Sequence, residues 1–282
     1  METITRRGLV TTAAGAFAVT ALSACSSGAG SSASTGSASA SASSDSTTTS
    51  GLSAQEEEGK LHVFIQHEEE TPEWIAALPA AKDEKTTQLF VVAALGMDKT
   101  TASISMHERG ADGKWKQVLS TPGFVGRDGL CEDEKHKEGG YYQTPIGTYH
   151  FNKAFGIAPD PGCTGFDYVK VNKNMYWSGE TQEGLHYNEM INIKDFLDAD
   201  FKNSKRIIDY EYEYQYCLNI SFNEDARPGK GSAIFLHCLD ESNPYTRGGI
   251  AVPEYTMQTI LQRVKSDCVV VIDTLENMNG KL

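Results

Sequence analysis

Two stretches near the C-terminal end determine how this chain folds, Ser232-Ala-Ile-Phe-Leu-His237 and Tyr245-Thr-Arg-Gly-Gly-Ile-Ala-Val-Pro-Glu254. The first is a short apolar run that ends in a histidine, which is typical of a buried strand. In the second, the pair Gly248-Gly249 favours a turn, and Pro253 is suited to the first turn of a helix. The sequence therefore predicts a strand, a loop and a helix over residues 253–265.

The rest of the domain reads mainly as strands, because Tyr and β-branched residues recur in short runs that turn residues separate. The expected strands cover residues 89–95, 102–106, 114–119, 148–151, 168–171, 206–210, 216–222, 232–237 and 268–272. A short helix is expected over residues 71–78, where Pro72 can open its first turn. The late helix has one apolar face, formed by Met257, Ile260, Leu261 and Val264. The sequence predicts a mainly β domain with one packing helix near the C-terminus.

The N-terminus has the organisation of an export signal over residues 1–24. Arg6 and Arg7 precede an uncharged run that is too short for a membrane span. The run ends in Leu22-Ser-Ala-Cys25, which resembles the lipobox of bacterial lipoproteins, where the cysteine thiol carries a diacylglycerol. The two arginines resemble a twin-arginine signal, and an ordinary Sec signal remains an alternative. We expect the protein outside the cytoplasm, anchored to the cell membrane through lipidated Cys25.

Residues 25–57 contain mainly Ser, Ala, Gly and Thr and end in an acidic run. Such a segment has almost no apolar surface to bury, so it is expected to be a flexible linker before a domain over residues 58–282. The whole chain carries a formal net charge of −13. This charge and the lack of a basic patch exclude nucleic acid as an expected partner, and they leave the lipid as the expected link to the membrane.

The frame His237–loop–Thr246-x-Gly248 resembles the catalytic motif of the L,D-transpeptidase (YkuD-type) family, whose enzymes cross-link bacterial peptidoglycan. Segments 120–123 and 144–151 resemble earlier signatures of the same family, so the likeness covers a core of about residues 88–275. The resemblance implies a β-sandwich or mixed-sheet domain, peptidoglycan stem peptides as partners, and no metal or cofactor.

The family places a nucleophilic cysteine where this chain has Gly249, and it uses the histidine that matches His237 as the base. Glycine has no side chain and cannot form an acyl-enzyme. Thr246 is expected to orient His237 through a hydrogen bond, and backbone N–H groups near Gly248 are expected to stabilise an oxyanion. The resemblance assigns substrate binding to Tyr187, Asn188, Tyr245 and Arg247.

Two classes of function follow from Gly249. The chain is either an L,D-transpeptidase-type enzyme, inactivated or using another nucleophile, or a non-catalytic lipoprotein that binds peptidoglycan or a wall enzyme. The glycine favours the second class. Cys238 is a poor substitute nucleophile because neighbours in a strand point to opposite faces, so its side chain is expected to be buried away from His237.

The remaining cysteines of the domain are Cys131, Cys163, Cys217, Cys238 and Cys268. Export permits disulfides, and Cys131 with Cys163 is the first choice for a bridge because both lie in loops that flank residues 141–151. No cysteine or histidine spacing indicates a zinc site, and the run Glu132–His136 is expected to be a solvated loop.

Overall fold

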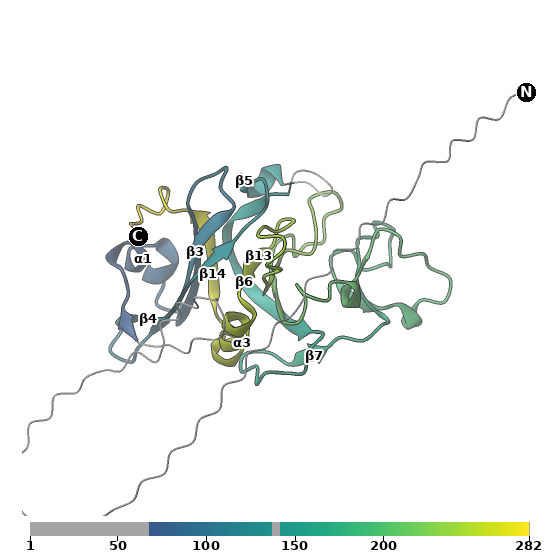
Figure 1. Cartoon of the computed structure of the whole chain (residues 1–282), viewed down its shortest axis with the longest axis horizontal. Helices are drawn as coiled ribbons and strands as arrows, with labels where there is room; N and C mark the ends of the chain where they lie inside the picture. The colour runs from purple at the N-terminus through teal and green to yellow at the C-terminus, as the bar shows by residue number, and fades with distance from the viewer. Residues whose placement is uncertain (1–67, 137–141, 282) are drawn as a thin grey trace, which may run out of the picture. The chain divides into compact units, whose positions relative to one another are not determined.

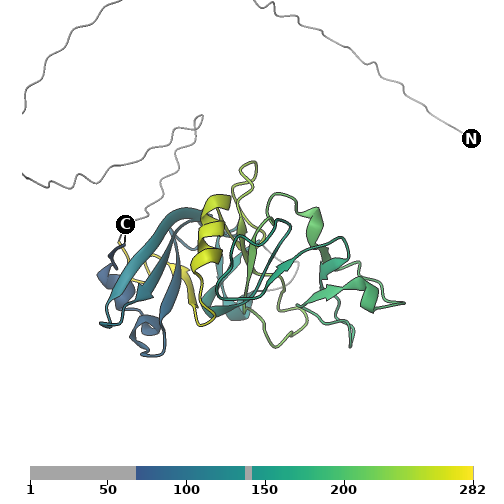
Figure 2. The same cartoon turned by 90° about the horizontal axis from the view of Figure 1, so that it is seen from below.

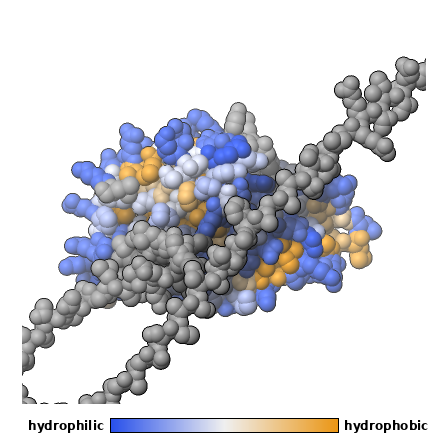
Figure 3. Space-filling view, in the orientation of Figure 1, coloured by the Kyte–Doolittle hydropathy of each residue, from blue (hydrophilic) through white to orange (hydrophobic). Residues whose placement is uncertain are grey.

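The computed structural model describes residues 68–136 and 142–281 (Figure 1). The expected signal peptide, the lipidation site Cys25, the linker 25–57 and the domain boundary at residue 58 lie outside these residues. No helix in the described part of the chain is long and apolar enough to cross a membrane. The face shown in Figure 3 is mainly hydrophilic, with small apolar patches among the polar side chains, as is common on protein surfaces.

The described chain forms an eleven-stranded sheet in which eight strands close into a barrel. Around the barrel the order is β4-β13-β12-β11-β6-β14-β2-β3, and β3 pairs with β4 to close it. These strands are β2 (Gln88–Ala94), β3 (Thr101–Arg109), β4 (Trp115–Phe124), β6 (Thr144–Gly156), β11 (Cys217–Ile220), β12 (Phe235–Cys238), β13 (Ile250–Val252) and β14 (Val269–Thr274). The other three strands are β1 (Glu69–Glu70), β5 (Leu130–Glu132) and β7 (Tyr168–Lys170).

The sheet is mixed. Within the barrel, β12 pairs with β13 and β14 pairs with β2 in parallel, and the other neighbours are antiparallel. The prediction of a mainly β domain is confirmed. Closure of the sheet removes most of the exposed strand edges that an open sheet would present.

The main hydrophobic core takes side chains from all eight barrel strands and from the helix α3 (Glu254–Arg263). Met257, Ile260, Leu261 and Val264 of the expected apolar face are fully buried, and Figure 2 shows α3 lying against the strands. The predicted helix near the C-terminus is therefore confirmed. The helix expected over residues 71–78 is present as the shorter α1 (Glu73–Ala76). A second short helix that was not expected, α2 (Pro79–Lys82), follows it, and the two are separate because Leu78 before Pro79 is extended.

A long excursion between β7 and β11 carries a second, three-stranded sheet. Its order is β10 (Lys205–Arg206), β8 (Met175–Trp177) and β9 (Met190–Asn192). The predicted strand over residues 206–210 is wrong beyond Arg206, because Ile207–Asp209 forms the 3-10 helix η3. This turn buries Ile207 in a cluster with Trp177 and Phe235, so packing against β12 outweighs local strand preference. The remaining 3-10 turns are η1 (Asp133–Lys135) and η2 (Ile193–Asp195).

The five cysteines of the described chain are free thiols, so the expected Cys131–Cys163 bridge does not form. Cys131 belongs to β5 and pairs with Pro145 at the start of β6. Cys163 follows the far end of β6, where its neighbour Thr164 hydrogen-bonds to the end of α3. The long strand β6 separates the two thiols, and a bridge needs Cα atoms within about 7 Å of each other.

Candidate functional site

His237 lies near the end of β12 and is buried. Its Nδ1 is 2.8 Å from the carbonyl oxygen of Cys238. A carbonyl only accepts hydrogen bonds, so Nδ1 carries the proton and Nε2 carries a lone pair. Burial lowers the pKa of His237 to about 4, with a smaller contribution from the nearby positive charge of Lys205, although the bond to the Cys238 carbonyl acts in the opposite direction. The ring is therefore neutral at pH 7.

Gly249 directly precedes β13, the strand that pairs with β12, and this pairing brings it beside His237. A Cβ atom placed on Gly249 would lie 3.2 Å from His237 Nε2 but only 2.5 Å from the backbone oxygen of Phe235. The left-handed backbone belongs to Gly248, whose φ is 120°, and not to Gly249. The site therefore keeps a base aimed at position 249, while backbone occupies the space that a side chain would need.

Thr246 is buried but does not orient His237 as expected. Its hydroxyl donates to the Gly249 carbonyl at 2.7 Å and accepts from the Gly248 N–H at 3.1 Å. The hydroxyl of Thr144 donates to the same Gly249 carbonyl at 2.9 Å. These bonds fix the loop, and they also occupy the Gly248 N–H that was expected to serve an oxyanion.

A cavity of about 140 Å³ opens over His237. Its walls are Lys205, Tyr210, Glu213, Tyr214, His237, Asp240, Asn243, Tyr245, Thr246 and Arg247. Tyr214 is stacked on Tyr210 with ring centroids 4.6 Å apart, and its ring meets His237 edge to face at 5.7 Å. The lining thus combines aromatic faces with two cations and two carboxylates, so it can contact both charges of a polar ligand.

Arg247 and Tyr245, both assigned to substrate binding by the resemblance, do line this cavity. Both side chains are exposed. The Arg247 guanidinium lies 5.8 Å from the ring centroid of Tyr142, and the Arg127 guanidinium lies 4.4 Å from the same ring. Two guanidinium groups thus share one aromatic ring, and that of Arg127 is also paired with the Asp128 carboxylate at 3.0 Å.

Tyr187 and Asn188 are not among the residues that line the cavity. Asn188 has a left-handed backbone with φ 59°, and its side chain makes four hydrogen bonds. Its oxygen accepts from the Trp177 indole and the Ala233 N–H, and its nitrogen donates to the carbonyls of Phe222 and Asn223. Asn188 therefore has a structural role, because its hydrogen bonds hold the excursion against the loop before β12. The neighbouring Tyr187 is buried.

Sequence reasoning missed Cys217, which pairs directly with His237 across β11 and β12. Directly paired residues point to the same face of a sheet, so this thiol shares the face of His237. Cys238 packs in the main core on the opposite face, as the alternation predicts. Burial raises the pKa of Cys217 well above its ordinary value and that of Cys238 to about 12. Neither buried thiol is a thiolate at neutral pH, so neither replaces the missing nucleophile.

The sequence also did not identify Tyr210, Glu213 and Tyr214, whose side chains line the His237 cavity. They belong to the end of the excursion, and only the fold brings them to β12.

The run Glu132–His136, expected to be a solvated loop, is partly structured. His136 is half-buried, with Nδ1 2.8 Å from the Lys230 carbonyl. Among the described residues, no three His, Cys, Asp or Glu side chains are grouped to hold a metal ion.

No family model matches this chain, and no curated protein matches it with significance. Among solved structures, it is similar to the helical cell shape determining protein Pgp2 from Campylobacter jejuni, with 14% sequence identity and a TM-score of 0.36. The similarity covers 68% of this chain and 49% of Pgp2, so the chain spans about half the length of that protein.

Proposed function

We propose that this protein is an exported cell-wall lipoprotein that binds peptidoglycan stem peptides in the His237 cavity without cleaving them. One observation carries the proposal. The lone pair of His237 Nε2 faces position 249, where Gly249 offers no side chain and the Phe235 carbonyl fills the adjacent space.

Acyl transfer through an enzyme-bound intermediate needs a nucleophile within reach of its base. A neutral, buried histidine is suited to accept a proton, yet no side chain at position 249 supplies one. The Thr246 hydroxyl is engaged with the Gly249 carbonyl, and the Cys217 and Cys238 thiols are buried and protonated. The site therefore retains the means to hold a peptide and lacks the means to attack it.

The cavity chemistry favours a peptide that carries both charges. Lys205 and Arg247 can donate hydrogen bonds to a terminal carboxylate, while Glu213 and Asp240 can accept them from an ammonium group. A cavity of about 140 Å³ is smaller than typical small-molecule sites of about 300–1,000 Å³, so it holds one end of a longer ligand. Stem peptides of peptidoglycan, which the L,D-transpeptidase resemblance implies as partners, have such ends. Lipidated Cys25 and the linker would hold the domain near the wall.

The test is a titration of the full-length protein with an uncross-linked stem tetrapeptide, followed by NMR and by intact-mass measurement. We expect signals near His237 to shift with no gain in mass. Arg247→Gln and Glu213→Gln should each weaken binding by about tenfold, since each removes one charge contact. Lys99→Gln, an exposed residue outside the cavity lining, is the matched control. A covalent adduct on the parent protein, or binding that both cavity variants leave unchanged, would overturn the proposal.

A further inference from the structure

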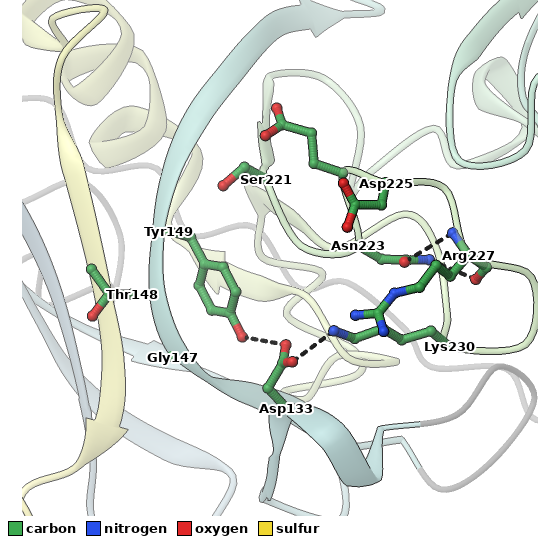
Figure 4. A pocket seen from close by; sticks show the side chains of 10 residues that line it. Asp133, Gly147, Thr148, Tyr149, Ser221, Asn223, Asp225, Arg227 and Lys230 are labelled. Carbon is green, nitrogen blue, oxygen red and sulfur yellow. Dashed lines mark hydrogen bonds and ion pairs between the residues drawn. The ribbon is translucent and has the colours of Figure 1, made fainter.

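A second cavity, of about 340 Å³, lies outside the His237 site and shares no lining residue with it. Its volume falls within the range of about 300–1,000 Å³ that is typical of small-molecule sites. It is lined by Asp133, Gly147, Thr148, Tyr149, Ser221, Asn223, Glu224, Asp225, Arg227 and Lys230 (Figure 4). The charged walls come from η1 and from the loop before β12.

One buried side chain organises this loop. Asn223 has φ 51°, and its amide nitrogen donates to the carbonyls of Arg227 at 3.0 Å and Gly231 at 2.8 Å. Its amide oxygen accepts from the Arg227 N–H at 3.1 Å. Both the N–H and the carbonyl of Arg227 are thus hydrogen-bonded to the Asn223 side chain, so this backbone is fixed without a ligand. Such preorganisation lowers the entropy cost of binding.

Several charges of the cavity are already paired. Lys230 Nζ lies 2.7 Å from Asp133 Oδ2, and the Tyr149 hydroxyl donates to Asp133 Oδ1 at 3.0 Å. Glu224 accepts from Asn152 at 2.9 Å and lies 3.4 Å from His150 Nε2. These contacts satisfy two of the three carboxylates in the walls.

Arg227 and Asp225 differ from these groups. Within the described residues, neither the Arg227 guanidinium nor the Asp225 carboxylate forms an ion pair, although the two lie two residues apart on the fixed loop. Figure 4 shows both side chains reaching from this loop into the cavity. A ligand therefore meets one unpaired cation and one unpaired anion.

We propose that this cavity binds the zwitterion of an α-amino acid, with the carboxylate on Arg227 and the ammonium on Asp225. A guanidinium pairs with a carboxylate through two parallel hydrogen bonds, and a carboxylate accepts readily from an ammonium. A phosphate or other dianion would meet the charges of Asp133, Glu224 and Asp225, while a simple cation would meet those of Arg227 and Lys230. A ligand that carries both a cation and an anion matches these walls better than either ion alone.

The zwitterion has two natural sources, a free amino acid or the diamino-acid side chain of a stem peptide, and the second source rests on the proposed function. The structure links the two cavities through His136. Its Nδ1 bonds to the Lys230 carbonyl, and its Nε2 lies 3.8 Å from the position that a Cβ on Gly248 would take. His136 thus connects the loop that carries Lys230 with the Gly248 loop, whose neighbouring residues Thr246 and Arg247 line the His237 cavity.

The test compares three small probes by calorimetry on the full-length protein. Alanine is a zwitterion, alaninamide lacks the carboxylate, and propionate lacks the ammonium. We expect alanine to bind at least about tenfold more tightly than either analogue. Equal binding of the three probes, or no binding of alanine, would overturn the zwitterion site. A stem tripeptide with diaminopimelate is then compared with one that carries lysine, whose side chain has no carboxylate. Tighter binding of the diaminopimelate peptide assigns the stem as the source, and equal binding assigns free amino acids.

Substitutions separate this site from the His237 cavity. Arg227→Gln and Asp225→Asn should each reduce alanine affinity by about tenfold, because each removes one charge pair. Lys99→Gln, an exposed residue outside both cavities, should leave alanine affinity unchanged. If Arg227→Gln has no effect while Arg247→Gln weakens alanine binding, the zwitterion belongs to the His237 cavity and the inference fails. Failure of the stem peptide to bind at His237 would leave the alanine result intact, so the two proposals are tested independently.

Discussion

His237 Nε2 and Gly249 face each other across neighbouring strands, with 3.2 Å between the nitrogen and the position of a Cβ on the glycine. The nitrogen carries a lone pair because Nδ1 is committed to the Cys238 carbonyl. This pair of positions would serve a nucleophile and its base if position 249 had a side chain. The glycine also lets the Phe235 carbonyl come close, within 2.5 Å of the same point.

Gly249→Cys is expected to make the protein reactive towards a carbapenem, an amide mimic that L,D-transpeptidases accept. A thiol at this position can transfer its proton to the lone pair of His237 as it attacks the carbonyl carbon. The new Cβ must push the Phe235 carbonyl aside, which should lower the free energy of unfolding by about 1–3 kcal/mol. Intact mass reports acylation, and urea denaturation reports the change in stability.

Gly249→Ala is the matched control, because it has the same steric cost without sulfur. The double variant Gly249→Cys with His237→Ala should lose most of the reactivity, since the base is gone. A folded Gly249→Cys protein that stays unmodified would show that the site has lost more than its nucleophile. Acylation of the parent at Cys217 or Cys238 would instead reveal a relocated thiol.

Thr246→Val should destabilise the loop without changing the titration of His237. The variant loses the bond to the Gly249 carbonyl and leaves the Gly248 N–H unpaired, which together cost about 1–3 kcal/mol of unfolding free energy. Thr246→Ser retains both bonds and should recover most of this loss. NMR titration of the His237 ring checks the second point. A large change in its pKa in the valine variant would restore the orienting role that the sequence suggested.

Local sequence was enough to place α3 and most barrel strands, because the apolar face of Met257, Ile260 and Leu261 and the short runs of apolar and β-branched residues depend only on nearby residues. Closure of the barrel was not predictable, since it depends on the pairing of β3 with β4 and of β14 with β2. The 3-10 turn at Ile207 was missed for a related reason. Its conformation is decided by packing against Trp177 and Phe235, far away in the sequence.

The candidate site shows the same division. Thr246, Tyr245 and Arg247 meet His237 because a short loop joins two adjacent strands. The tyrosine walls and the pairing of Cys217 with His237 come from the long excursion and from strand register, which a single sequence does not reveal. Asn188 was expected to bind substrate but supports a loop. A polar residue in either role has a similar local sequence, so the sequence alone does not distinguish the two.

Cys25 is expected to carry a lipid and to be the N-terminal residue of the mature protein, because Leu22-Ser-Ala-Cys25 resembles a lipobox. Mass spectrometry of the membrane-extracted protein should detect a diacylglycerol on Cys25. Cys25→Ser is expected to release the protein from the membrane fraction, since the acidic chain has no electrostatic attraction to anionic lipids. An unmodified mature protein that begins at another residue would rule out the anchor.

Acid should destabilise the domain through two buried histidines. Burial lowers the pKa of His107 from 6.5 to about 3 and that of His237 to about 4. At a pH between the folded and the unfolded pKa, each histidine is protonated in the unfolded chain and neutral in the folded protein. The free energy of unfolding therefore falls as the pH drops below 6.5, by up to about 1.4 kcal/mol per pH unit for each ring. Above pH 6.5 the two rings do not change the free energy of unfolding.

His107→Gln tests this dependence because it removes the titrating ring and keeps an amide for the hydroxyls of Thr71 and Ser105, which bond to His107 at 2.9 and 2.8 Å. Urea denaturation from about pH 8 to about pH 4.5 should give a shallower acid loss in the variant than in the parent. His237→Gln should flatten the curve by a similar amount, and the double variant should combine both effects, since the two histidines lie on different strands, β3 and β12. An identical pH slope in parent and variants would mean that both rings accept a proton without unfolding.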